Sequence, residues 1–189
     1  MKTDPVNIIG ARPYAEVREA CHRLKDYGER ALGAPTRQAF FEMFPLRVDE
    51  LRPLVEAVPP HAMLIPVPGH LGAATYTKAL AWAVLALCPE KKVFVCDCLE
   101  GPQRESLCTL KQKGIPTDDV PVVFRVKEGL MNVLGDISSL MERNVPVIVD
   151  NVVDSGRTAK AAMKALGFDC PVLAVGDTGQ AEPVKTLTP

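Results

Sequence analysis

The chain has 189 residues, of which 47% are hydrophobic and 24% charged, and its 22 basic and 23 acidic residues give a net charge of -1. This length suits one domain, the composition is typical of a globular protein with a packed core, and the mixed charges predict no broad basic surface for nucleic acid. The N-terminus lacks the basic start and apolar core of a signal peptide, and no apolar run is long enough to span a membrane. We therefore expect a cytoplasmic protein with no membrane or nucleic-acid partner.

The N-terminal part of the chain carries helical patterns. Residues 14–32 place apolar side chains at helical spacing, with charges on the other face; these are Val17, Ala20, Cys21, Leu24, Tyr27 and Leu32. Further helical patterns cover 36–44 and 46–58, and Pro59 and Pro60 end the last of them. We assign residues 1–58 to a helical N-terminal segment and 59–189 to a following core.

The core alternates short apolar runs with helices. Runs rich in Val, Ile or Phe predict buried strands at 62–67, 92–96, 121–126, 145–150 and 170–175. Helical patterns lie at 73–88, about 131–143, and 157–166, the last closing at Gly167 as a left-handed cap. Alternating strands and helices predict an α/β fold, a parallel sheet of about five strands with helices on both faces.

Two other features bear on chemistry. Residues 97–120 are polar and without a period, which predicts a functional lid or a disordered loop, and the closing residues predict a loose tail. The six cysteines have no regular spacing and favour buried free thiols. Cys96 and Cys98 suggest a metal or redox pair, but the one-residue spacer and the lack of a second pair argue against zinc. We expect no dedicated metal ligands.

The stretch from 145 to 158, VPVIVDNVVDSGRT, predicts a buried strand followed by a turn and the start of a helix. Ligands of open parallel sheets bind beyond the carboxyl ends of strands, and the first amides of a helix form a phosphate cradle. Gly156 permits close approach of an anion, and the hydroxyls of Ser155 and Thr158 add donors. Asp150 suits the paired hydroxyls of a ribose, whereas Asp154 either assists proton movement or holds the loop. We expect both carboxylates to lie on a surface loop.

The segment VIVDNVVDSGRT resembles the phosphoribosyl pyrophosphate (PRPP) motif of type I phosphoribosyltransferases, in which four apolar residues precede two acids, two apolar residues and Asp-Ser/Thr-Gly-x-Thr. The resemblance implies that fold with an N-terminal helical hood over the acceptor. It implies that Asp150 contacts the ribose hydroxyls and Asp154 lies nearest the reacting base. The PRPP-binding residues would be Asn151, Ser155, Gly156, Arg157 and Thr158. Asn151 departs from the pattern, because the family usually has a second acid there.

The same resemblance assigns two further loops. The turn after the first core strand would be the pyrophosphate loop, comprising Val67, Pro68, Gly69 and His70; an ordinary proline-rich turn is the alternative. The sequence PVP before a helix is also similar to competence-type phosphoribosyltransferases. Residues 97–120 would be the flexible catalytic loop, with Arg104, Lys111 and Lys113 neutralising pyrophosphate, and Arg125 is a similar candidate. Solvated surface charges are the alternative for each of these cations.

The function implied is transfer of 5-phosphoribosyl from PRPP to a nitrogenous acceptor with release of pyrophosphate, a step in nucleotide metabolism. Mg²⁺ would be bound mainly through the substrate. A non-catalytic PRPP- or nucleotide-binding regulatory protein stays open as an alternative, favoured by Asn151. An accessory role in DNA uptake is a third reading, against which the lack of a basic stripe argues. The sequence names no acceptor and leaves a homodimer open.

Overall fold

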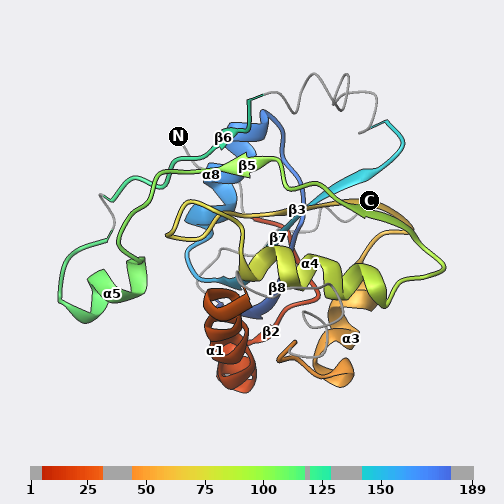
Figure 1. The fold of residues 1–189 in the computed structure, drawn as a ribbon, viewed down its shortest axis with the longest axis horizontal. Helices are drawn as coiled ribbons and strands as arrows, with labels where there is room; N and C mark the ends of the chain where they lie inside the picture. The colour runs from red at the N-terminus through yellow and green to blue at the C-terminus, as the bar shows by residue number, and fades with distance from the viewer. Residues whose placement is uncertain (1–5, 32–43, 118–119, 129–141, 180–189) are drawn as a thin grey trace, which may run out of the picture.

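The computed structural model describes residues 6–31, 44–117, 120–128 and 142–179. Within them the fold is α/β, built on a parallel sheet with strand order β1-β8-β7-β3-β4, to which β2 is joined through β8 (Figure 1). These strands are β1 (Ile8–Ile9), β2 (Arg12–Pro13), β3 (His61–Pro66), β4 (Lys92–Val95), β7 (Val145–Val153) and β8 (Val172–Asp177). The expected parallel α/β sheet is confirmed.

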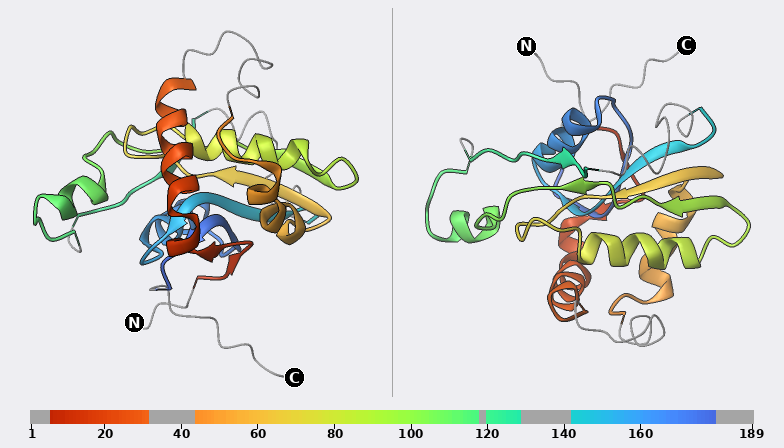
Figure 2. Two further views of the ribbon diagram at one scale, coloured as in Figure 1. Left: turned by 90° about the horizontal axis from the view of Figure 1, so that it is seen from below. Right: turned by 45° about the horizontal axis from the view of Figure 1, so that its top comes forward.

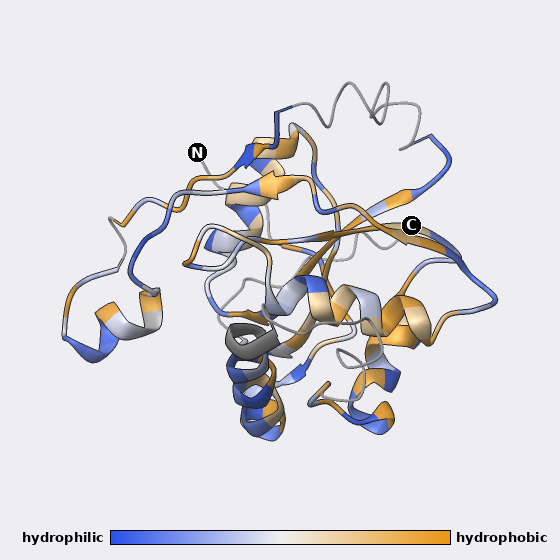
Figure 3. Ribbon diagram, in the orientation of Figure 1, coloured by the Kyte–Doolittle hydropathy of each residue, from blue (hydrophilic) through white to orange (hydrophobic). Residues whose placement is uncertain are grey.

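Helices cover both faces of the sheet (Figure 2). The helices α1 (Tyr14–Ala31), α3 (Val48–Ala57) and α4 (Tyr76–Ala86) pack on one face, and α8 (Arg157–Leu166) packs on the other. In β7, Val147 and Val149 face the first group while Ile148 faces α8, because successive strand residues point to opposite faces. Both faces are therefore buried, and the strands are coloured hydrophobic along most of their length in Figure 3.

The two helices predicted most closely from sequence are α1 and α8. The apolar stripe of α1 is buried from Val17 to Tyr27, and Leu32 lies outside the described residues. The bounds of α8 agree with the expected 157–166, and Gly167 ends it at a φ of 82°. The predicted left-handed cap is confirmed, and an L side chain there would be strained.

The chain departs from the expected strands in two places, and two expected helices are not tested. Residues 121–126 do not form a strand of the main sheet: only β6 (Arg125–Val126) is extended, and it pairs antiparallel with β5 (Leu99–Glu100). Pro121 lacks an amide donor for a strand ladder, and Val123 is exposed in the structure, so residues 121–124 do not continue the strand. The short strands β1 and β2 were not predicted. The helices expected at 36–44 and about 131–143 lie almost wholly outside the described residues.

Residues 97–120 are not without structure. They contain β5 and a short helix, α5 (Leu107–Gln112), which with β6 forms an arm that projects from the core in Figures 1 and 2. We call residues 99–126 the arm; 118 and 119 are not described. The division of the chain at residue 58 stays a prediction. Over the described ranges, no helix is both long and apolar enough to cross a membrane.

Candidate functional site

Two loops predicted to hold phosphate groups begin side by side. β3 and β7 are neighbours in the sheet, with Pro66 paired to Val149, and both run in the same direction. The turn after β3 (residues 67–73) and the loop after β7 (residues 154–158) therefore lie at the same carboxyl edge. Val67 donates its amide to the Val149 carbonyl at 3.1 Å, which fixes the start of the 67–73 turn against β7.

The 154–158 loop leads into α8 with its amides available. Gly156 adopts a φ of 74°, and a Cβ there would lie 2.9 Å from Val6 Cγ2 in the hydrophobic cluster beneath. Glycine is thus required on the core side of this turn. Ser155 is exposed. Within the described ranges the backbone amides of residues 155–158 have no hydrogen-bond acceptor, whereas the Lys160 amide already donates to the Gly156 carbonyl at 2.9 Å. The loop retains the donors that a phosphate needs.

Asp150 is buried, contrary to the expectation that it lies on a surface loop. It belongs to β7, and its residue is 7% exposed. Burial raises the pKa of the Asp150 carboxyl to about 6, although its Oδ1 accepts the Asn151 amide at 2.7 Å. No cation pairs with it in the described part of the chain. Its Oδ2 accepts no described hydrogen bond. It keeps some exposure to solvent, because Asn151 Oδ1 is the only side-chain N or O atom of the described residues that is both fully enclosed and without a partner. One oxygen of this buried carboxylate therefore has no described partner.

Asn151 is turned toward α1. Its Nδ2 donates to the Cys21 carbonyl at 2.9 Å, and its Oδ1 is buried without a hydrogen-bond partner in the described residues. This side chain occupies the position of the family's second acid, but it is directed at the helix covering the opposite face from α8. Asn151 therefore lies apart from the open side of the 154–158 loop.

Asp154 links three elements. Its Oδ2 accepts Lys111 Nζ of α5 at 2.6 Å, and its Oδ1 accepts the Thr178 hydroxyl, just beyond β8, at 3.0 Å. Burial acts to raise the pKa of Asp154, but these hydrogen bonds and the charge of Lys111 outweigh it and lower the pKa. In this arrangement Asp154 is a weak base and holds the loop in place. Thr178 was not among the residues predicted from the sequence.

The 67–73 turn uses much of its backbone internally. Gly69 donates to the Ala73 carbonyl at 3.0 Å and Gly72 donates to the Gly69 carbonyl at 3.1 Å. The Thr77 hydroxyl closes the turn further by donating to the Val67 carbonyl at 2.7 Å. The amides of Val67 and Gly69 are thus occupied, and Pro68 has none. If this turn binds pyrophosphate, it does so through amides other than those of Val67, Gly69 and Gly72.

The arm lies against both predicted loops. Its backbone amides at Gly101 and Arg104 donate to the carbonyls of Gly72 and His70 at 3.1 and 2.8 Å. Farther along the arm, the Arg157 guanidinium of α8 donates to the carbonyls of Thr117 and Val120. The segment predicted to be a lid is therefore in contact with the 67–73 turn and with the start of α8.

An ion-pair cluster fixes the base of the arm. Asp97 accepts Lys78 Nζ of α4 at 2.8 Å and Lys127 Nζ at 2.7 Å, so the residues flanking both ends of the arm are joined. Burial opposes ionisation of Asp97, but the hydrogen bonds from Lys127 and Lys78 lower its pKa. The arm is anchored at its base, and its tip is joined to the core chiefly through polar contacts.

Two arginines lie near one another where the arm meets α8. Burial and the neighbouring charge of Arg157 lower the pKa of the Arg104 guanidinium, although Tyr76 acts in the opposite direction. Neither guanidinium has a carboxylate partner in the described residues. Lys113 instead pairs with Glu105 inside the arm, and Arg125 with Glu100 across β5 and β6 at 2.8 Å. Of the predicted lid cations, Arg104 and Lys111 reach the site.

Removal of Lys111 tests how the arm is held. Its ion pair with Asp154 joins side chains that are 55% and 38% exposed. We expect Lys111→Ala to change the unfolding free energy by less than about 1 kcal/mol, because exposed ion pairs contribute little. Thermolysin cleavage within the arm should nevertheless accelerate. Lys113→Ala, which breaks a pair internal to the arm, is the matched control. Equal acceleration in both variants would show that the Lys111 contact does not hold the arm.

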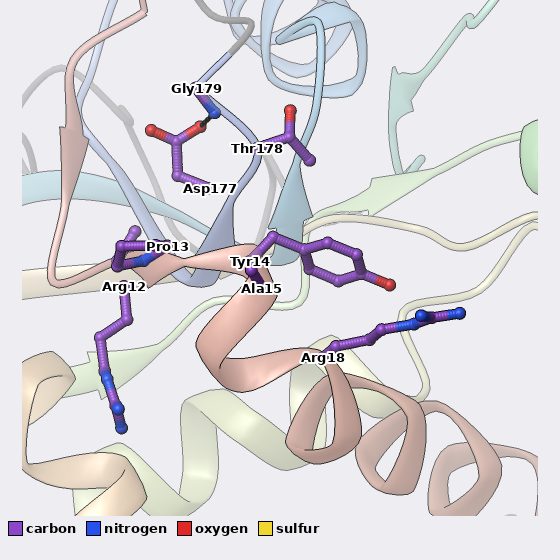
Figure 4. Close-up of a pocket in the computed structure, with 9 residues that line it drawn as sticks. Arg12, Pro13, Tyr14, Ala15, Arg18, Asp177, Thr178 and Gly179 are labelled. Atoms are coloured by element: carbon purple, nitrogen blue, oxygen red, sulfur yellow. Dashed lines mark hydrogen bonds between the residues drawn. The ribbon is translucent and has the colours of Figure 1, made fainter.

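A pocket opens beside this site (Figure 4). It has a volume of about 780 Å³ and is lined by residues 11–15, Arg18 and residues 177–179. Sequence analysis missed it; the available signal was the polar, aromatic line of Tyr14, Arg18 and His22, spaced four residues apart on α1. The pocket adjoins Asp154 through Thr178 but does not include Asp150 or residues 155–158.

The described residues contain no group of three or more His, Cys, Asp or Glu side chains arranged to hold a metal ion. Cys96 and Cys98 are free and buried, as are Cys21, Cys88 and Cys170. Comparison of the chain with protein-family models, with curated proteins and with solved structures gave no match in any of the three. A function is therefore inferred from the geometry and from the motif at residues 147–158.

Proposed function

We propose that this protein binds PRPP at the carboxyl edge of β3 and β7 and transfers its phosphoribosyl group to a nitrogen nucleophile. The observation that carries the proposal is the open start of α8, whose first amides have no acceptor among the described residues and lie near Arg104 and Arg157, neither of which has a carboxylate partner there. Such a combination favours a ligand with more than one phosphate group. The likeness of residues 147–158 to the PRPP motif supports the same ligand.

Each side chain has a definite part in this proposal. The 5'-phosphate would accept hydrogen bonds from the amides of residues 155–158, and the Asp150 Oδ2 would accept from a ribose hydroxyl. Arg104 would balance the charge of pyrophosphate from the arm, and residues 1–58 would form the hood of a type I phosphoribosyltransferase fold. Asp154 would position the loop through Lys111 and Thr178.

The reaction would form a bond from the acceptor nitrogen to C1' while the bond from C1' to the pyrophosphate oxygen breaks. Pyrophosphate leaves with the electron pair, so catalysis consists of alignment and of neutralising the charge that develops on it. Magnesium would be held mainly by oxygens of the substrate, since the described residues offer no cluster for it and Asn151 is turned away. A shielding arm would exclude water, which competes with the acceptor.

A second candidate function is binding of PRPP without transfer. It is favoured by the turned-away Asn151 and by the 67–73 turn, whose amides are largely occupied. Measuring pyrophosphate release over a panel of nitrogen heterocycles separates the two functions. Release with any acceptor establishes the transferase, whereas tight PRPP binding without release over the whole panel establishes the binding protein.

Binding of PRPP with Mg²⁺, measured by isothermal titration, tests the site itself. We expect saturable binding to the natural chain and at least a roughly tenfold weaker affinity for Ser155→Asp, because a carboxylate at the cradle repels phosphate. Ser155 is exposed, so the variant should fold. Asn144→Asp adds the same charge just before β7, at the opposite edge of the sheet, and should bind as the natural chain does. Equal losses in both variants would argue against the cradle.

A further inference from the structure

The pocket beside Asp154 lies between helix α1 and the edge of the sheet. Its floor comes from β2 and the end of β8, and its wall from the first turns of α1, as Figure 4 shows. Its volume of about 780 Å³ falls within the usual range of small-molecule sites. It lies at the same carboxyl edge as the 154–158 loop, since Asp177 is paired in register with Val153.

The side chain of Thr178 connects the pocket to the 154–158 loop. Thr178, which lines the pocket, donates its hydroxyl to Asp154 Oδ1 at 3.0 Å and its amide to the Val153 carbonyl at 3.0 Å. A molecule in the pocket would therefore neighbour a ribose held after β7. This is the place from which a second substrate can approach the sugar without displacing its phosphate.

Most polar groups around the pocket already have partners. Arg12 pairs with Glu16 at 3.3 Å, and the Asp177 carboxylate accepts the Gly179 amide at 2.9 Å. Arg18 differs, because it has no ion pair or hydrogen bond among the described residues. An exposed guanidinium at a pocket wall, paired with no acid among the described residues, is suited to bind a carboxylate in a fork geometry.

Tyr14 supplies a flat surface next to this cation. Its ring packs close to the sheet, since a Cβ on Gly176 would lie 3.3 Å from Tyr14 Cδ2, and its hydroxyl is 3.3 Å from His22 Nε2. Tyr14 and Arg18 are one helical turn apart, and Figure 4 shows both side chains directed to the same side of α1. A half-buried ring beside a guanidinium matches a planar ligand that carries a negative substituent.

We infer that this pocket is the acceptor site and that the acceptor is a planar nitrogen heterocycle bearing a carboxylate. The inference rests on the proposed phosphoribosyl transfer. Tyr14 stacks on the ring, Arg18 binds the carboxylate, and the ring nitrogen faces the sugar beyond Thr178.

Matched pairs of heterocycles test this assignment by isothermal titration. Nicotinate and orotate are compared with nicotinamide and uracil, with ribose 5-phosphate present to fill the sugar site without permitting transfer. We expect the carboxylates to bind at least about tenfold more tightly than their uncharged partners. Arg18→Ala should remove this preference, Arg18→Lys should keep part of it, and Tyr14→Ala should weaken all planar ligands. Lys25→Ala, which removes a positive charge elsewhere on α1, is the control and should leave the preference intact.

The PRPP affinity of the same variants separates failure of this inference from failure of the proposed function. Arg18→Ala should bind PRPP as tightly as the natural chain. If PRPP binds but no carboxylate does, or if the preference persists in Arg18→Ala, the acceptor assignment is wrong and the transferase proposal stands. If the natural chain fails to bind PRPP, the proposed function is wrong and the acceptor role of the pocket falls with it.

Discussion

Replacement of Gly72 by alanine should lower the unfolding free energy by about 3 kcal/mol and release the arm from the core. Gly72 has a φ of 84°, and an added Cβ would lie 2.5 Å from the Gly101 carbonyl oxygen. Strain at positive φ accounts for roughly 1 kcal/mol of this, and the collision for the rest. Because the opposing atom belongs to the backbone, no side chain can rotate to relieve the contact. Urea unfolding and hydrogen exchange at Gly101 and Arg104 would measure the two effects.

Gly114, which also lies in the arm, provides a control for backbone strain. Gly114 has a φ of 71°, but nothing lies within 4 Å of a Cβ built there. Gly114→Ala should therefore cost only about 1 kcal/mol and leave exchange at the Gly101 amide unchanged. If the two variants lose the same stability, the close approach of the arm to the 67–73 turn does not exist in solution.

The site was predictable from sequence wherever local chemistry decides the structure. The strand leading to Asp150, the turn at Gly156 and the exact bounds of α8 follow from an apolar run, a glycine and a helical period. The same local reasoning placed 121–126 in the main sheet, which is wrong, because a run of Val and Phe does not reveal which partner a strand finds. In the structure Arg125 pairs with Glu100, and Phe124 packs against the face that α8 covers.

Contacts between distant segments could not be predicted. The pairing of Lys111 with Asp154 joins residues 43 positions apart, and Arg157 reaches the arm across a similar separation. The direction of the Asn151 side chain could not be predicted either, because it depends on a hydrogen bond to the Cys21 carbonyl of α1. Residue types identified the candidates for the site, but the docking of the arm decides which of them meet.

Asp150→Asn should stabilise the fold at neutral pH while weakening PRPP binding. The pKa of Asp150 is raised from 3.8 to about 6 by burial, so the folded chain holds this proton more tightly than the unfolded chain. The stability that Asp150 contributes is therefore fully present below about pH 4 and is lost as the pH rises through 6. At pH 7.5 the loss amounts to about 3 kcal/mol, which asparagine avoids. Urea unfolding of both proteins from about pH 3.5 to 7.5 should show stabilities that agree at the acid end, diverge as the pH rises from about 4 to 6, and differ by a constant amount above that.

Asp154→Asn is the matched control and should behave in the opposite sense. Hydrogen bonds lower the pKa of Asp154, so its contribution to stability is present above its unfolded pKa and is lost only as the pH falls through the folded value. Its asparagine variant should be less stable than the natural chain at pH 7.5. A gain in stability together with a loss of PRPP affinity in Asp150→Asn would show that the buried carboxylate is kept for its ligand. A stability profile for Asp150→Asn that runs parallel to that of the natural chain would show that Asp150 is not a strained acid, and would remove the strongest reason for placing a ribose there.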